Sequence, residues 1–322
     1  MSSPPPDIFS RRFSSGEIRD FAATRQPASA PRGGRTRLSV VLPSYNQARF
    51  LRRTLNSIAN QHYGKLQLIV MDGGSSDGSQ AIIEEFHDVV GSYESGPDGG
   101  QAAAINKGFR KAEGDFIAWQ NADDLYLPGF FDAIDAAVAC YPDAELVIAN
   151  NYHIDAEDRI LWTTKYGPFG VPYLAYVDWN LSSQSVFVRR GLAERVGPLP
   201  HYNVAFDYEW FLRVGQAARR IVEMKRYGGA YRIHPASKFT TADRQAREAL
   251  ELRILADLGY RPVPGRGMAE QWPLRRAALS RWQRLNARLL YTEQPRNLPL
   301  RLAWALVLKL CRPGMLGYLS LR

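Results

Sequence analysis

The residues from Asn121 to Asp124 place one amide and two carboxylates within four positions, directly after the apolar run Phe116–Trp119. Two adjacent carboxylates at the end of a buried strand are costly to desolvate unless a cation neutralises them. Carboxylate and amide oxygens suit hard divalent ions, which also bind phosphate. The segment could therefore be a metal and phosphate site. It could equally be a solvated turn that caps a helix opening near Pro128.

A second candidate carboxylate is Asp207, in the first turn of the helix expected to begin at Phe206. At 100° per residue, Asp207 shares the apolar face of that helix with Trp210, whereas Glu209 lies on another face. An acid on the apolar face of a first helical turn is either an N-cap or a buried reactive group. We therefore expect Asp207 to be the working carboxylate and Glu209 to be solvated.

Two more polar loops follow apolar runs that read as strands. Ser44–Gln47 follows Leu38–Pro43, and the glycine-rich segment Asp72–Ser79 follows Leu66–Met71. Glycines let the backbone approach a ligand closely, and the acids of such a loop can accept hydrogen bonds from a base or ribose. The second loop could also be only a tight turn between a strand and a helix.

The order of the expected elements predicts an α/β fold with a mostly parallel sheet, because strands alternate with helices. In such sheets, ligands bind at the carboxyl ends of the strands, where the three polar loops fall. The expected helices cover 48–60, 79–88, 101–111 and 128–141, and further strands cover 89–94, 146–149, 158–163 and 184–188, with a hairpin of 221–224 and 229–233.

For two other features the sequence leaves two alternative roles. The segment 166–180 is rich in aromatic residues, which either fill the core or form platforms for sugar rings. His234 ends the last expected strand beside Ser237 and Lys238, where it is either a structural histidine or a site residue.

The net charge of +9 is unevenly distributed along the chain. Residues 1–37 carry +4 and read as a disordered basic segment, residues 38–260 carry −5, and residues 261–322 carry +10. A nucleic-acid-binding protein would more often carry its basic patch on the folded body, so we expect no nucleic-acid partner. Cys140 and Cys311 lie far apart and form no metal-ligand spacing, which fits a reducing, cytoplasmic location.

The C-terminal region contains an amphipathic pattern. Residues 273–291 place apolar residues on one helical face with arginines around it. Residues 298–311 are mostly apolar but short for a bilayer span. Helices at 273–311 could pack on the folded domain. They could also attach the protein peripherally to anionic lipid, on the inner face of the cytoplasmic membrane.

Taken together, these motifs resemble glycosyltransferase family 2, the inverting nucleotide-sugar transferases of the GT-A fold. The resemblance covers about residues 38–240 and implies a GT-A domain with a Rossmann-like sheet and a C-terminal helical extension. The motifs that carry it are Pro43-Ser-Tyr-Asn-Gln47, Asp72 to Ser79, Glu94 to Asp98, Asn106-Lys-Gly108, Gly114 to Pro128, Phe206-Asp-Tyr-Glu209 and Tyr231-Arg-Ile-His-Pro235.

The resemblance implies a role for each matching position. Asp207 would be the general base, and Asp123 would coordinate Mg²⁺ or Mn²⁺ on the diphosphate, with Asp124 and His234 as further metal ligands. The implied contacts to the nucleotide sugar come from Pro43, Ser44, Tyr45, Asp72, Asn106, Lys107, Asn121 and Asp123.

Two residues depart from the family pattern. Asn121 replaces the usual first acid of the metal motif, and Ala103 stands where relatives commonly carry an acid. The resemblance implies transfer from a UDP- or dTDP-sugar to a glycan or lipid-linked acceptor in surface or exopolysaccharide biosynthesis. The departures leave a second hypothesis, a catalytically silent nucleotide-sugar-binding scaffold. A nucleotidyltransferase is a weaker third, because the chain lacks the basic glycine-rich loop that a triphosphate requires.

Overall fold

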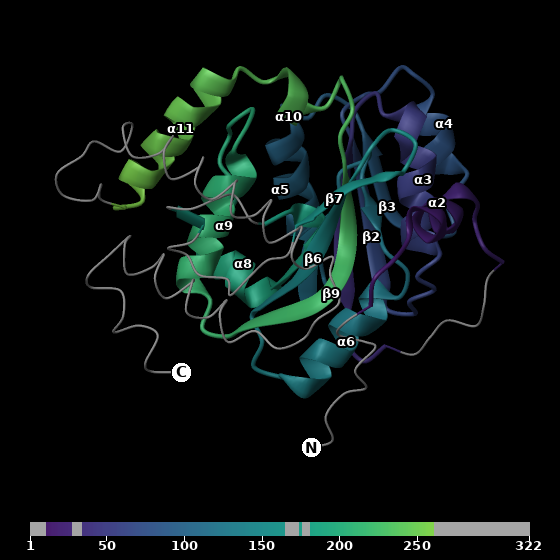
Figure 1. Ribbon diagram of the computed structural model, residues 1–322, viewed down its shortest axis with the longest axis horizontal. Coiled ribbons are helices and arrows are strands. Elements are labelled where there is room, and N and C mark those ends of the chain that lie inside the picture. The colour runs from purple at the N-terminus through teal and green to yellow at the C-terminus, as the bar shows by residue number, and fades with distance from the viewer. Residues whose placement is uncertain (1–10, 28–33, 165–173, 176–180, 261–322) are drawn as a thin grey trace. The chain divides into compact units, whose positions relative to one another are not determined.

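The computed structural model describes residues 11–27, 34–164, 174–175 and 181–260. Its centre is a mixed sheet in the order β3-β2-β1-β4-β8-β6-β9-β5, with β7 paired to β6 (Figure 1). The strands are β1 (Leu38–Ser44), β2 (Leu66–Asp72), β3 (Val90–Ser95), β4 (Phe116–Trp119), β5 (Leu125–Tyr126), β6 (Leu146–Ile154), β7 (Ile160–Thr164), β8 (Val186–Arg189) and β9 (Ile221–Arg232).

The strand directions bring most of the carboxyl ends to one edge of the sheet. Strands β1 to β4 pair in parallel, as the alternation of strands and helices predicts. Strand β8 is antiparallel to both β4 and β6, and β9 is parallel to β6. Strands β6 and β9 therefore run in the same direction as β1 to β4. The loops after these strands meet at a single edge, which is where such sheets bind ligands.

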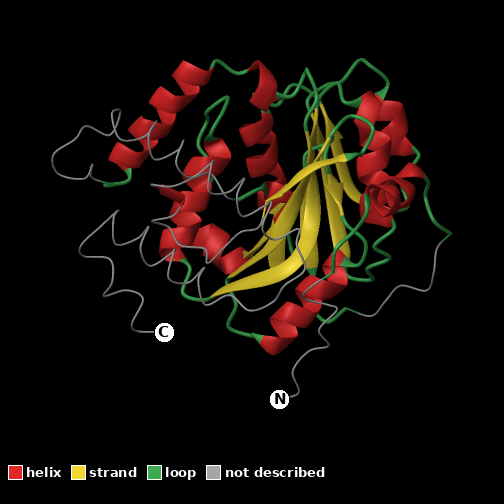
Figure 2. Cartoon of the chain, viewed as in Figure 1, coloured by secondary structure: helices red, strands yellow, loops and turns green. Residues whose placement is uncertain are grey.

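Helices cover both faces of the sheet (Figure 2). The helices are α2 (Ser15–Ala23), α3 (Ala48–Ala59), α4 (Ser79–Glu84), α5 (Gln101–Lys111), α6 (Phe130–Cys140), α8 (Arg190–Val196), α9 (Phe206–Ala217), α10 (Lys238–Thr241) and α11 (Arg244–Asp257). Because side chains alternate along a strand, Val41 packs with α5 and α9, whereas its neighbours Val40 and Leu42 pack with α3 and α6. Both faces of β1 are buried, which explains its unbroken apolar sequence.

Several elements differ from the sequence-based prediction. The hairpin expected within 221–233 is one continuous strand, β9, because Gly228 and Gly229 lie inside the strand rather than in a turn. At Gly229 a Cβ atom would lie 2.4 Å from the backbone oxygen of Gln184, so glycine here permits a close backbone approach. Strand β5 and the helices α8, α10 and α11 were not expected.

The expectation of disorder over residues 1–37 is wrong for residues 15–23. Ser14 caps α2 through a capping box with Glu17, and the helix buries Ile18, Phe21 and Ala22. The side chain of Asn60 donates hydrogen bonds to the carbonyls of Phe21 (2.7 Å) and Thr24 (2.9 Å). Helix α2 is therefore part of the folded domain.

Within the described ranges, no helix has the length and apolar character needed to cross a bilayer. The segment 273–311, for which peripheral membrane helices were predicted, lies outside these ranges.

Candidate functional site

Asp123 and His234 meet at the edge formed by the strand ends. Asp123 lies in the loop between β4 and β5, and His234 follows the end of β9. The Nε2 atom of His234 lies 3.1 Å from Oδ2 of Asp123, and the Asp123 side chain retains 20% exposure. The ring of Phe50, from α3, packs against the imidazole with a centroid distance of 4.7 Å. The structure thus brings together two of the three predicted metal ligands.

Asp124 has different surroundings from those of its neighbour Asp123. Its side chain is fully buried, and its oxygens accept hydrogen bonds from the Arg232 backbone N–H (2.7 Å) and the Asn121 amide (2.8 Å), and from the Gln184 amide. Burial, followed by the charge of Asp123, raises the pKa of the Asp124 carboxyl well above its usual value. The prediction that Asp124 is a metal ligand does not agree with these contacts, because they hold the carboxylate inside the protein.

Asn121 links the predicted metal motif, residues 121–124, to α5 and α10. Its amide nitrogen donates to Asp124, and its Oδ1 atom accepts a hydrogen bond from the Gln101 amide at 2.8 Å. The Oε1 atom of Gln101 in turn accepts from the Lys238 ammonium at 2.9 Å. An aspartate at 121 could not donate to the buried Asp124 carboxylate, so asparagine fits this position better.

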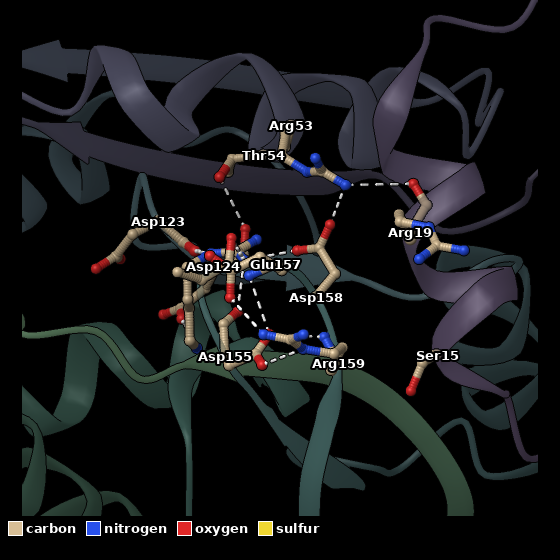
Figure 3. A network of polar contacts seen from close by, with 12 residues as sticks. Ser15, Arg19, Arg53, Thr54, Asp123, Asp124, Asp155, Glu157, Asp158 and Arg159 are labelled. Atoms are coloured by element: carbon tan, nitrogen blue, oxygen red, sulfur yellow. Dashed lines mark hydrogen bonds and ion pairs between the residues drawn. The ribbon is translucent and has the colours of Figure 1, made fainter.

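The backbone of the metal motif is held by Arg232 of β9 and by Thr54 of α3, and Figure 3 shows Thr54 above Asp124. The Nε atom of Arg232 donates to the carbonyl of Asp123 at 2.7 Å, and the hydroxyl of Thr54 donates to the carbonyls of Ala122 (2.9 Å) and Asp124 (2.8 Å). Buried donors that satisfy successive carbonyls fix the path of a loop. The loop therefore presents Asp123 outward and Asp124 inward.

Asp207 lies in the first turn of α9, whose N-cap is Ala205, so the N-cap alternative for Asp207 is excluded. Its carboxylate is partly buried, and Oδ1 accepts a hydrogen bond from the backbone N–H of Tyr208 at 3.0 Å. Burial is the main cause that raises the pKa of Asp207 to about 6, and the charge of Glu251 adds to it, whereas Lys238 opposes it. A carboxylate with such a pKa suits proton abstraction near neutral pH.

The acid expected to be solvated, Glu209, instead forms an ion pair with Arg213 one turn along α9. Its Oε1 atom lies 2.6 Å from Nε of Arg213, and the Glu209 side chain is 14% exposed. Glu209 is thus a structural residue of this helix.

Lys238 is the cation that connects the two parts of the site. The carboxylates of Asp207, Asp123 and Asp98 each act on its ammonium group, and they oppose the lowering of the Lys238 pKa that burial causes. The predicted base and the predicted metal ligand therefore share one positive neighbour.

The predicted contacts in the first strand loop divide into buried and exposed residues. Pro43 and Ser44 are buried within β1, and the buried hydroxyl of Ser44 has no hydrogen-bond partner among the described residues. Tyr45, by contrast, is 62% exposed. A Cβ atom on Gly73 would lie 3.1 Å from the Tyr45 ring and 3.2 Å from Oδ2 of Asp98, so these three residues converge. Gly73 leaves room between an exposed ring and a carboxylate.

The side chain of Asp72 is saturated by its own loop. Oδ2 accepts from the backbone N–H groups of Gly74 (3.1 Å) and Ser75 (2.9 Å) and from the Ser95 hydroxyl (2.6 Å). Oδ1 accepts from the Ser75 hydroxyl at 2.5 Å, and the residue is 2% exposed. These contacts give Asp72 the role of shaping the glycine-rich loop, and the predicted hydrogen bond to a base does not agree with them.

Asn106 and Lys107 likewise make contacts within the protein. The Asn106 amide pairs reciprocally with the backbone N–H and carbonyl of Leu199, at 2.8 and 2.9 Å. Lys107 forms an ion pair with Glu94, at the end of β3. In this arrangement Asn106 anchors the segment before α9, so neither predicted sugar contact is supported by the geometry.

Sequence reasoning missed several residues that build the site. Gln101, Gln184 and Arg232 bind the metal motif directly, and Lys238 and Asp98 supply charge beside it. Arg232 and Asp98 stand within motifs already noted for the family resemblance, and Lys238 had been noted only as a neighbour of His234. The sugar-platform interpretation of 166–180 concerns residues that lie, except for 174–175, outside the described ranges.

The Asp123–His234 pair fits a divalent cation. If two ligand atoms bind an ion at right angles with bonds of about 2.1 Å, the two atoms lie about 3 Å apart. This separation agrees with the 3.1 Å between Nε2 of His234 and Oδ2 of Asp123. The described ranges contain no group of three or more histidine, cysteine or acidic side chains arranged for a metal. A Mg²⁺ or Mn²⁺ ion here would take its remaining ligands from water and from substrate phosphate, as such ions commonly do.

Comparisons with known proteins agree with this architecture. The family model for glycosyl transferase family 2 matches residues 39–197. A PGL/p-HBAD biosynthesis glycosyltransferase of Mycobacterium bovis is 30% identical over 183 residues, which cover 54% of this chain and 68% of the relative. A glycosyltransferase of Nostoc is 33% identical over 101 residues, a match that spans only 30% of that relative's length.

Solved structures show the same fold at lower identity. S. aureus TarS, crystallised with UDP-GlcNAc, is similar with a TM-score of 0.59 and 16% identity, covering 73% of this chain and 69% of the TarS chain. The mannosyltransferase PcManGT of Pyrobaculum calidifontis, in complex with GDP-Man and Mn²⁺, is similar with a TM-score of 0.52 and 20% identity. The match covers 93% of this chain and 88% of the PcManGT chain. The predicted α/β fold of the GT-A type is confirmed by these similarities.

Proposed function

The chain belongs to glycosyltransferase family 2, and we propose that it transfers a sugar from a nucleoside-diphosphate sugar to a hydroxyl group of a glycan or lipid-linked acceptor. The observation that carries the proposal is the shared neighbourhood of Asp207 and Asp123, whose charges both act on Lys238. A base for the acceptor and a ligand for the diphosphate thus stand at the same edge of the sheet.

The chemistry follows from these positions. Asp207 takes the proton of the acceptor hydroxyl as its oxygen attacks the anomeric carbon, and the bond from that carbon to the diphosphate breaks. Direct displacement with one base inverts the anomeric centre. A divalent ion held by Asp123 and His234 would supply positive charge to the leaving diphosphate. Lys238 adds a second positive charge on the same side.

The donor base is proposed to lie against Tyr45. The exposed ring can stack on a base, Gly73 leaves room beside it, and the Asp98 carboxylate can accept a hydrogen bond from the imide N–H of uracil or thymine. A UDP- or dTDP-sugar is therefore the proposed donor. TarS is similar to this chain in fold and was solved with UDP-GlcNAc, which supports this class of donor.

The proposal is tested by nucleoside diphosphate release from a panel of UDP-, dTDP- and GDP-sugars, with Mn²⁺, with Mg²⁺ and with EDTA. We expect metal-dependent release that Asp207→Asn abolishes while nucleotide binding persists. Glu209→Gln, an acid of the same helical turn, is the matched control and should retain activity. Tight donor binding without turnover in any condition would contradict the proposal and favour a silent scaffold.

The cellular setting is a separate part of the proposal. We propose surface polysaccharide biosynthesis at the cytoplasmic face of the membrane, motivated by the +10 charge of residues 261–322. Flotation of the full chain with anionic and with neutral liposomes tests this. Equal partitioning into both kinds of liposome would contradict an electrostatic attachment.

A further inference from the structure

Three aromatic rings form a row across strands β7, β6 and β9. Trp162 is the register partner of His153, and His153 is the register partner of Tyr231. The indole of Trp162 stacks on the His153 ring with a centroid distance of 4.7 Å and an interplanar angle of 22°. The His153 ring meets Tyr231 edge-on, at 5.7 Å and 72°.

The row lies on the face of the sheet that carries α9. Tyr152, which precedes His153, packs with Phe13 and Ile18 on the opposite face. Because side chains alternate along a strand, His153 and its register partners point toward the face that α9 covers. The row therefore shares its face with Asp207.

One end of the row reaches the candidate catalytic site. Burial is the main cause that raises the pKa of the Tyr231 phenol, and the charges of Asp124, Asp123 and Asp207 add to it. Tyr231 lies beside the metal motif, because the backbone N–H of the next residue, Arg232, donates to Asp124 at 2.7 Å. It stands directly before Arg232, which holds the loop that contains Asp123.

The other end of the row is open. Trp162 is 47% exposed even though its indole stacks on His153. A cross-strand aromatic pair by itself helps to hold β7 on β6, and it explains why the two rings stack. It does not explain why the larger ring keeps half its surface in water at the end of a row that leads to Asp207.

We propose that the outer face of Trp162 binds a sugar ring of the acceptor. This inference rests on the proposed function, because it assigns the acceptor side of the same site. One face of a pyranose ring carries C–H groups made positive by the neighbouring oxygens, and these suit the negative face of an indole. Ligand sites are typically lined by aromatic and apolar side chains together with a small number of polar groups.

The spacing defines the size of the acceptor. Trp162 lies two strand spacings from Tyr231, which is about 10 Å. A single pyranose ring does not cover that distance, so the acceptor is an oligosaccharide or a glycan chain. Its reacting hydroxyl meets Asp207 while a sugar unit further along the chain rests on Trp162.

The test is saturation-transfer NMR with a panel of free oligosaccharides, in the presence of UDP and Mn²⁺. The wild-type protein should transfer saturation to the C–H protons on one face of a pyranose unit. Trp162→Ala should weaken oligosaccharide binding about tenfold, the loss expected for one aromatic contact, and leave UDP affinity at the wild-type value. Trp162→Phe should restore most of the binding.

Leu161→Ala is the matched control. Leu161 is 46% exposed on the same strand, but it has no register partner on β6 because the pairing of the two strands shifts at this residue, and it takes no part in the aromatic row. This variant should bind oligosaccharides as the wild type does. Equal saturation in Trp162→Ala and wild type, or no saturation of any oligosaccharide by the wild type, would overturn the proposal. Oligosaccharide binding without donor turnover would instead contradict only the proposed transferase activity.

Discussion

Arg232 and Asp158 form an ion pair in which neither side chain has any exposed surface. Their closest nitrogen and oxygen atoms, Nη1 and Oδ1, lie 2.6 Å apart. Asp158 also pairs with Arg53 of α3, and Arg232 donates to the carbonyl of Asp123. Asp158, which lies beside Arg53 in Figure 3, thus connects α3 through Arg232 to the loop that contains Asp123. The Arg232 and Asp158 side chains stay paired because an unpaired charge in the protein interior is very unfavourable.

Asp158→Asn is expected to lower the free energy of unfolding by about 3–5 kcal/mol, because it leaves the Arg232 charge buried with one anion fewer. Asparagine has a similar shape and tolerates the positive φ of 63° at this position, so the loss reports the charge. The double variant Asp158→Asn with Arg232→Met should lose less than the sum of the two single variants. Urea denaturation of the four proteins measures this coupling.

Arg159→Met provides the control for that cycle. Arg159 lies in the same turn and pairs with Asp155 at 2.7 Å, but its side chain is 66% exposed. An exposed pair contributes little, so the variant should lose less than about 1 kcal/mol. If Asp158→Asn and Arg159→Met lose equal stability, the buried pair does not have the structural role described above.

The N-terminal helix shows where composition misleads. Residues 1–37 are rich in serine, proline, glycine and arginine, a composition typical of disorder. The average over this window conceals a short amphipathic helix whose buried residues Ile18, Phe21 and Ala22 recur at helical spacing, and Phe13 packs with two of them, Ile18 and Ala22, from just before the N-cap. A capping box begins the helix, and a nine-residue element gains its stability from the tertiary contacts it makes.

Ile18→Ala should therefore lower the free energy of unfolding by about 2–5 kcal/mol, as expected for a buried branched side chain. Ile18 is 1% exposed among the aromatic and aliphatic residues of β5, β6 and β9. Asp20→Ala, in the same helix with a side chain 78% exposed, should be nearly neutral. Chemical denaturation distinguishes the two variants. An unchanged midpoint in Ile18→Ala would mean that α2 does not pack as described.

The sequence predicted the sheet better than the site. Apolar runs located β1, β2 and β4, because burial on both faces of these strands imposes a pattern that can be read locally. The contacts of Asp72 and Asp124 could not be read in this way. The sequence does not distinguish a carboxylate that binds a ligand from one that accepts hydrogen bonds from its own loop. Partners such as Gln184, 60 residues from Asp124, become neighbours only in the folded sheet.

Asp123→Asn and Asp124→Asn should separate metal binding from folding. Asp123→Asn removes a carboxylate ligand at the surface, so we expect a weaker response to Mn²⁺ with little loss of stability. Asp124→Asn turns an N–H₂ group toward buried donors such as the Arg232 backbone N–H or the Gln184 amide. That mismatch should lower the free energy of unfolding by about 1–3 kcal/mol. Manganese titration of donor turnover and urea denaturation measure the two effects; the reverse pattern would restore Asp124 as the metal ligand.

The pH dependence of turnover tests the role of Asp207. Burial raises the pKa of this carboxyl to about 6, and only the ionised form can accept the acceptor's proton. With saturating metal, kcat/KM should therefore rise as the pH increases through about 6 and then level off. Because a raised pKa disfavours the folded state as the group ionises, Asp207→Asn should be at least as stable as the wild type above that pH. An inactive but stable Asp207→Asn separates the loss of the base from a loss of fold. A kcat/KM that does not change between pH values on either side of the Asp207 pKa would exclude this residue as the base.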